Sequence, residues 1–150
     1  MKSLTIADLV KPKGRKPAQV KTPEIEPGSI CWILAPTADQ RDQFEIQWGS
    51  YLESQGGSAK GFRKFMVAYC LADAENCQLM DPGDDVEFSD EFVGFAESLN
   101  ESVPIKSLAR LFDVAMNKMG MTKSDVEELE KNCETIHSDD GNGSTPSTTE

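Results

Sequence analysis

The chain has 150 residues, a net charge of −11 and a mean hydropathy of −0.45, with 26 acidic against 15 basic residues. This length corresponds to one domain, and the excess of carboxylates argues against binding nucleic acid, because phosphate contacts require lysine or arginine. No apolar run approaches the ~20 residues that a membrane-spanning helix needs. We therefore expect neither nucleic acid nor a membrane as a partner.

The N-terminal region, residues 1–29, is basic, whereas the rest of the chain is acidic. Residues 1–22 hold six basic residues against Asp8 alone. Such a segment is either a solvated terminus or a contact for an acidic surface. Four prolines and two glycines within residues 11–28 predict a flexible linker. Apolar residues before the linker predict one or two helical turns, and they are Leu4, Ile6, Leu9 and Val10.

The four cysteines do not form a disulfide framework in a chain of this length. The N-terminus has no apolar signal sequence. We therefore expect a cytosolic protein with reduced thiols.

A strand and a capped helix are predicted after the linker. The β-branched and aromatic run at 30–34 predicts a strand that ends before Pro36. Thr37 and Gln40 form a capping-box pattern, in which each side chain bonds the backbone amide of the other. The apolar period that follows predicts a helix over about 38–53.

A second apolar helix is predicted over about 59–72, after the glycine pair Gly56 and Gly57. Residues 77–80 are predicted to form a short strand that returns beside the strand at 30–34. The sheet would then be at most a short β-hairpin.

Three further helices are predicted from their end signals. Ser89 is a candidate N-cap for the first, and Pro104 is a candidate first residue for the second. Gly120 would end that second helix in a left-handed conformation. Thr122 would cap the third helix, with Asp125 in a box-like arrangement three residues later.

The predicted fold class is therefore mainly α, with at most a short β-hairpin. The helical domain is expected to span residues 30–133. Residues 134–150 contain almost no large apolar side chains and cannot bury enough area to offset their ordering entropy, so we expect a disordered tail.

The sequence offers no strong signal for a metal or for catalysis. Cys70 and Cys77 are seven residues apart, which is too far for a structural zinc pair, and Cys133 and His137 would need a helix that continues into the tail. The acidic stretch at 81–92 lacks the oxygen ligand at position 3 and the glycine at position 6 of an EF-hand loop. We expect no metal, no cofactor and no enzymatic activity, with a small metal-dependent hydrolase as the weaker alternative.

The helix pair at 107–132 has the strongest apolar pattern of the chain. As a DNA-reading helix-turn-helix it fails on charge, because its second helix would present Glu127 and Glu128 to phosphates. Such a stripe is usually core, but a cluster of methionines also suits a surface that adapts to a partner helix. The candidate partner-binding residues are Leu108, Leu111, Phe112, Met116, Met119 and Met121.

The order of segments over about 4–133 resembles the tail assembly chaperones of long-tailed, siphovirus-like phages and prophages. A short N-terminal helix, TIADLVKP, precedes the strand and a capped helix with the sequence RDQFE at 41–45. The stretch FRKFMVAYCLADAENCQLMD follows. The most specific part is L-x-x-L-F-x-x-A from Leu108, then G-x-T at 120–122 and DVEELEKN.

The resemblance implies a non-catalytic chaperone that acts in the host cell cytoplasm and is absent from the mature virion. It implies that the protein binds the long, apolar tape measure protein and keeps it soluble during tail morphogenesis. It further implies recruitment of tail tube subunits, and self-association is compatible with this role. The alternative from another class is a small transcriptional regulator or anti-repressor built on the helix hairpin.

Overall fold

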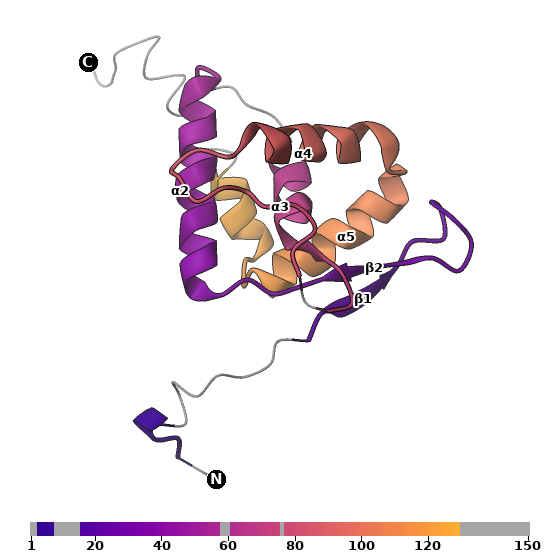
Figure 1. Cartoon of the computed structure of the whole chain (residues 1–150), viewed down its shortest axis with the longest axis horizontal. Coiled ribbons are helices and arrows are strands. Elements are labelled where there is room, and N and C mark those ends of the chain that lie inside the picture. Colours follow the sequence, from indigo (N-terminus) through magenta and orange to yellow (C-terminus); the bar gives the residue numbers. More distant parts are fainter. Residues whose placement is uncertain (1–2, 8–15, 58–60, 76, 130–150) are drawn as a thin grey trace.

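The computed structural model describes residues 3–7, 16–57, 61–75 and 77–129. Figure 1 shows the labelled helices grouped together, with the hairpin of β1 (Ala18–Lys21) and β2 (Ile30–Ile33) along one edge of the group. The predicted mainly α fold with a short β-hairpin is confirmed. A helix at 123–129 follows the last named element. The named elements are β1 (Ala18–Lys21), β2 (Ile30–Ile33), α2 (Ala38–Ser54), α3 (Phe62–Cys70), β3 (Leu71–Ala72), α4 (Asp90–Ser102) and α5 (Ile105–Lys118).

The small sheet has the strand order β1-β2-β3, and both pairings are antiparallel. The structure differs from the predicted linker at residues 18–21, which form β1. Val20 pairs with Cys31 of β2 and is buried, so pairing and burial fix a strand between two prolines.

The predicted strand at 77–80 does not pair with β2. β2 pairs instead with β3, which directly continues α3, and Gln78 forms an isolated bridge with Ala72. The returning chain therefore lies beside β3, where the Leu79 amide donates to the Leu71 carbonyl at 3.0 Å.

Two of the predicted helix starts are confirmed by their hydrogen bonds, whereas Pro104 is the N-cap of α5 and not its first residue. The Gln40 amide donates to Thr37 Oγ1 at 3.1 Å, and the Thr37 amide donates to Gln40 Oε1 at 2.9 Å, which completes the capping box. The Ser89 hydroxyl accepts a bond from the Phe92 amide at 3.2 Å, at the start of α4. These local bonds satisfy amides that the first helical turn leaves without partners.

The turn after α5 is a Schellman motif. Gly120 has a φ of 71°, in the left-handed region. Its amide donates to the Asn117 carbonyl at 3.0 Å, and the Met121 amide donates to the Met116 carbonyl at 3.0 Å. Thr122 then caps the helix at 123–129, because its hydroxyl accepts the Asp125 amide at 3.1 Å.

Helix α3 is the centre of the core. It contacts both α4 and α5, and every one of its residues except Arg63 is buried. Phe65 stacks on Phe88 with ring centroids 5.2 Å apart, and Phe44 meets Tyr69 edge to face at 4.9 Å. Aromatic rings from α2, α3, α4 and the loop before α4 thus form one cluster.

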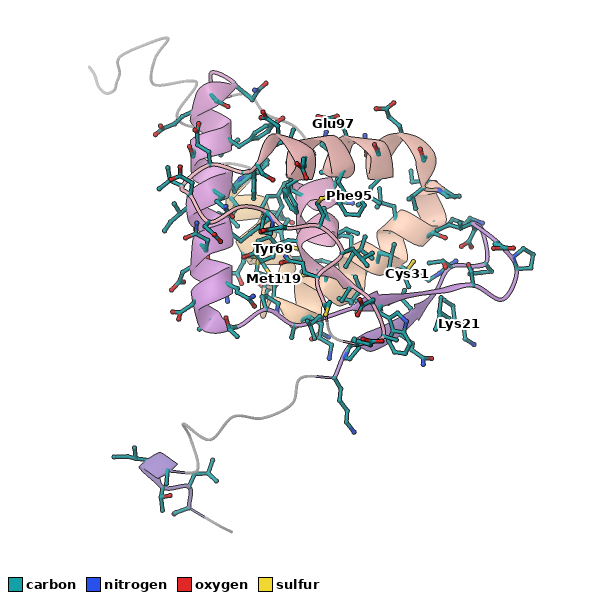
Figure 2. The ribbon with its side chains drawn as sticks, viewed as in Figure 1. Lys21, Cys31, Tyr69, Phe95, Glu97 and Met119 are labelled. Atoms are coloured by element: carbon teal, nitrogen blue, oxygen red, sulfur yellow. The ribbon has the colours of Figure 1, made fainter. Side chains whose placement is uncertain are left out.

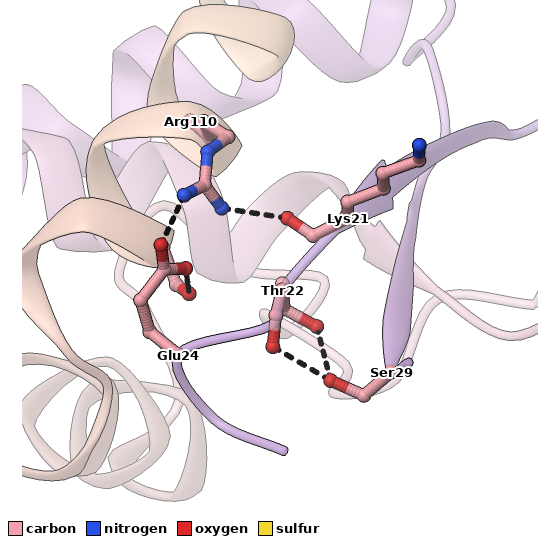
Figure 3. A network of polar contacts seen from close by, with 6 residues as sticks. Lys21, Thr22, Glu24, Ser29 and Arg110 are labelled. Carbon is pink, nitrogen blue, oxygen red and sulfur yellow. Dashed lines mark hydrogen bonds and ion pairs between the residues drawn. The ribbon is translucent and has the colours of Figure 1, made fainter. Parts of the chain in front are cut away.

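The turn of the β1–β2 hairpin is attached to α5 by the network in Figure 3. Arg110 donates to the Lys21 carbonyl at 2.8 Å and pairs with the Glu24 carboxylate. The Ser107 hydroxyl donates to the same carboxylate at 2.7 Å. The bonds from Arg110, and then from Ser107, lower the pKa of Glu24 to about 2. The hairpin is therefore held by charge as well as by the burial of Val20.

Candidate functional site

The structure places most of the predicted partner-binding stripe inside the core. Leu111, Phe112, Met119 and Met121 are 1%, 6%, 2% and 5% exposed. The remaining two predicted residues, Leu108 and Met116, are partly buried and pack against the same core.

Two contacts explain this burial. α5 packs on α3 and on the first two strands, and the Arg63 guanidinium covers the Phe112 ring at 4.9 Å from its centroid. The Schellman turn directs the chain back, so that Met121 and Val126 also reach the core. Figure 2 shows Met119 among the packed helices. A partner therefore cannot contact the four buried side chains in this conformation.

Some of the residues that raised a metal question have structural roles, whereas Cys133 and His137 lie outside the described residues. Among the described residues, no group of three or more His, Cys, Asp or Glu side chains could hold a metal ion. The Asp81 carboxylate accepts a hydrogen bond from the Gly83 amide at 2.9 Å, and the Asp85 carboxylate accepts one from the Val86 amide at 2.8 Å. These carboxylates therefore stabilise the loop that contains them. Burial raises the pKa of the Cys70 thiol to about 12, which removes it as a nucleophile at neutral pH.

No helix within the described ranges is both long and apolar enough to cross a membrane.

The outer face of α2 carries an exposed apolar groove, which we call the α2 groove. Ile46 and Val86 form its apolar walls and are 52% and 56% exposed. Its volume is about 620 Å³. The lining residues are Glu45, Ile46, Gly49, Ser50, Leu52, Glu53, Gly56, Gly57 and Val86.

Helical periodicity builds one wall of this groove. The inward face of α2 presents the buried residues Phe44, Gln47, Trp48 and Leu52. The outward face places Ile46, Gly49, Ser50 and Glu53 at spacings of three, four and seven residues, so these four share one side of the helix. One face of α2 therefore packs in the core, and the opposite face forms a wall of the groove.

The buried side chain of Gln47 holds the opposite wall. Its Nε2 atom lies 3.1 Å from the carbonyl oxygens of Gly83 and Asp85 and 3.4 Å from those of Pro82 and Glu87. Its Oε1 atom is buried without a hydrogen-bond partner. The side chain thus gathers four backbone carbonyls of the loop that carries Val86, and α2 positions both walls.

Gly49 forms part of the groove although the fold does not require a glycine there. A Cβ atom at this position would meet no atom within 4 Å. Glycine inside a helix is less favourable than alanine by about 1 kcal/mol. Gly49 leaves an open space between Ile46 and Glu53, at a small cost in stability.

The surroundings of the α2 groove are acidic. α2 carries four carboxylates against Arg41 alone, which pairs with Glu45 at 3.4 Å. The loop at 81–87 carries four more carboxylates and no basic residue. None of the described residues that line the groove is basic. The site therefore suits an apolar segment with positive charges beside it.

A smaller groove of about 240 Å³ lies between α5 and the helix at 123–129. Phe112, Met116 and Val126 contribute its apolar lining, so it keeps part of the predicted site. Phe112 and Val126 are 6% and 4% exposed, which leaves little apolar surface for a partner. Its rim has both signs of charge, from Arg63, Asp113, Lys123 and Glu127.

Sequence reasoning therefore missed the more open of the two grooves. Ile46 and Gly49 were the available signal, because both lie off the apolar face that Phe44 and Trp48 define. Val86 gave no such signal, since its position depends on the distant side chain of Gln47.

Fold and site together define a small, mainly helical domain with an acidic surface and an exposed apolar groove. Comparison of the chain with protein-family models, with curated proteins and with solved structures finds no match.

Proposed function

We propose that this protein is a tail assembly chaperone of a long-tailed phage or prophage. It binds the tape measure protein in the host cytoplasm, keeps it soluble and helps to recruit tail tube subunits, without catalysis. The order of sequence segments over about 4–133 supports this proposal.

The observation that carries the proposal is the α2 groove. Ile46 and Val86 remain more than half exposed on a domain that buries an extensive aromatic core. Two exposed apolar side chains that face one groove suit contact with an apolar segment of another molecule. An apolar client helix would cover Ile46 and Val86, with its backbone close to Gly49.

The charge of the chain supports the same role. A net charge of −11 makes copies repel one another and keeps them soluble when many coat one client. The carboxylates around the α2 groove favour client segments with lysine or arginine beside their apolar stripe. We expect such segments to bind first.

Nothing in the described part of the chain favours the regulator built on the helix hairpin. The apolar side of the helix hairpin is buried in the core, and the second helix of the hairpin exposes Glu127 and Glu128. These carboxylates would repel DNA phosphates.

Co-expression with the tape measure protein tests the proposal. We expect the wild-type chain to move that protein into the soluble fraction, and Ile46→Asp with Val86→Asp to abolish the effect. Ile105→Asp is the matched control, because Ile105 is 84% exposed at the start of α5, outside the groove. A tape measure protein that stays as insoluble with the wild-type chain as without it would refute the proposal.

A further inference from the structure

We propose that the N-terminal arm, residues 1–16, of one copy docks in the α2 groove of a second copy. The arm and the groove carry opposite charge, and each offers apolar side chains that its own molecule leaves uncovered. That the arm occupies the groove until a client replaces it rests on the proposed function, whereas the contact between copies does not.

The apolar part of the contact comes from two arm residues. Leu4 and Ile6 are 55% and 80% exposed in the monomer. The α2 groove of the same molecule leaves Ile46 and Val86 exposed as well. Docking the arm of another copy would remove all four side chains from water, which is the main favourable term in association.

The charges select the α2 groove over the smaller one. The arm carries five basic residues against Asp8 alone. The α2 groove is lined by Glu45 and Glu53, with further carboxylates on α2 and on the loop at 81–87. The smaller groove has two basic and two acidic residues on its rim, so its charges balance and do not attract the arm.

A contact between two copies needs the basic arm, because the rest of each chain is acidic. Two chains of net charge −11 repel each other unless a basic segment lies between them. Reciprocal exchange of two arms places a basic segment against each acidic groove and closes the pair with two equal contacts.

Sedimentation velocity of the full chain over a range of concentrations tests the contact. We expect concentration-dependent association that weakens as salt is raised. Leu4→Asp with Ile6→Asp in the arm, and Ile46→Asp with Val86→Asp in the groove, should each give monomers. An equimolar mixture of these two variants should associate again, because one supplies an intact groove and the other an intact arm.

A pair of glycine variants separates docking from folding. Gly49→Leu fills the groove and should weaken association at least tenfold. Gly94→Leu is the matched control, since Gly94 also lies in a helix, α4, with no atom within 4 Å of an added Cβ. It should leave association unchanged, and circular dichroism should show both variants folded.

The inference is overturned if the wild-type chain stays monomeric at all concentrations, if the arm variant still associates, or if Gly49→Leu associates like Gly94→Leu. A monomer whose Leu4 and Ile6 are protected from proteolysis would show that the arm covers its own groove, which also overturns it. The client experiment is independent. A monomeric chain that still solubilises the tape measure protein would keep the proposed function and refute only the exchange of arms.

Discussion

Replacing Gln47 by glutamate should make the stability of this protein depend steeply on pH. The Gln47 side chain is fully buried, and its Nε2 atom faces four carbonyl oxygens at 3.1–3.4 Å. A carboxylate in this place would meet acceptors only. A buried carboxyl group that meets acceptors stays protonated, so the pKa of the introduced glutamate would rise above its usual ~4.3.

The sign follows from proton linkage. Because the folded variant would hold its proton more tightly than the unfolded chain, its free energy of unfolding should fall as pH rises above ~4.3. The loss is about 1.4 kcal/mol per pH unit until the folded pKa is reached. If that pKa is about 7 or higher, the variant loses about 3.7 kcal/mol between about pH 4.3 and pH 7. This is a large fraction of the ~5–15 kcal/mol that a domain typically has.

Urea unfolding followed by circular dichroism at a series of pH values measures this loss, expressed as the difference from wild type. Gln43→Glu is the matched control. Gln43 lies on the same helix and donates to the same Asp85 carbonyl at 2.6 Å, but the bond is exposed to water. We expect only a weak pH dependence for it. If the free energy of unfolding of Gln47→Glu differs from that of wild type by the same amount across this pH range, the buried contact of Gln47 with the loop carbonyls is refuted.

Three further predictions follow from single contacts. Gly120→Ala should lower the free energy of unfolding by ~1–3 kcal/mol in urea unfolding, because its φ of 71° strains other residues. In wild type, the lowered pKa of Glu24 adds stability above pH 4.5 that is lost as pH falls toward 2. Glu24→Gln should therefore show less acid destabilisation in a thermal melt over this range. Cys77 should react with a thiol reagent in the folded state while the buried Cys70 does not, as peptide mass spectrometry can check.

The elements that were predicted correctly from the sequence are marked by residues that lie a few positions apart in the chain. Thr37 with Gln40, Ser89 with Phe92, and Gly120 each act through bonds inside one turn. Such bonds need only residues that are near in sequence, so they can be predicted without the rest of the fold.

The elements that sequence reasoning missed depend on distant partners. β1 exists because Val20 finds Cys31 and because Arg110, far along the chain, binds the Lys21 carbonyl. β3 replaces the predicted end of α3, because Leu71 pairs with Ile33. Local composition favoured a linker and a longer helix at these places, and tertiary pairing outweighed it.

Most of the predicted partner-binding stripe is buried for a related physical reason. A continuous apolar stripe such as that of α5 gains most by burial, so Leu111 and Phe112 become core. A surface that stays available for a partner carries fewer apolar residues, or the monomer would bury it too. A partner-binding site is better indicated by positions where the residue adds no stability to the monomer. Ile46 exposes an apolar side chain, and Gly49 weakens its helix with no neighbour that requires it. Both features become favourable once another segment lies in the α2 groove.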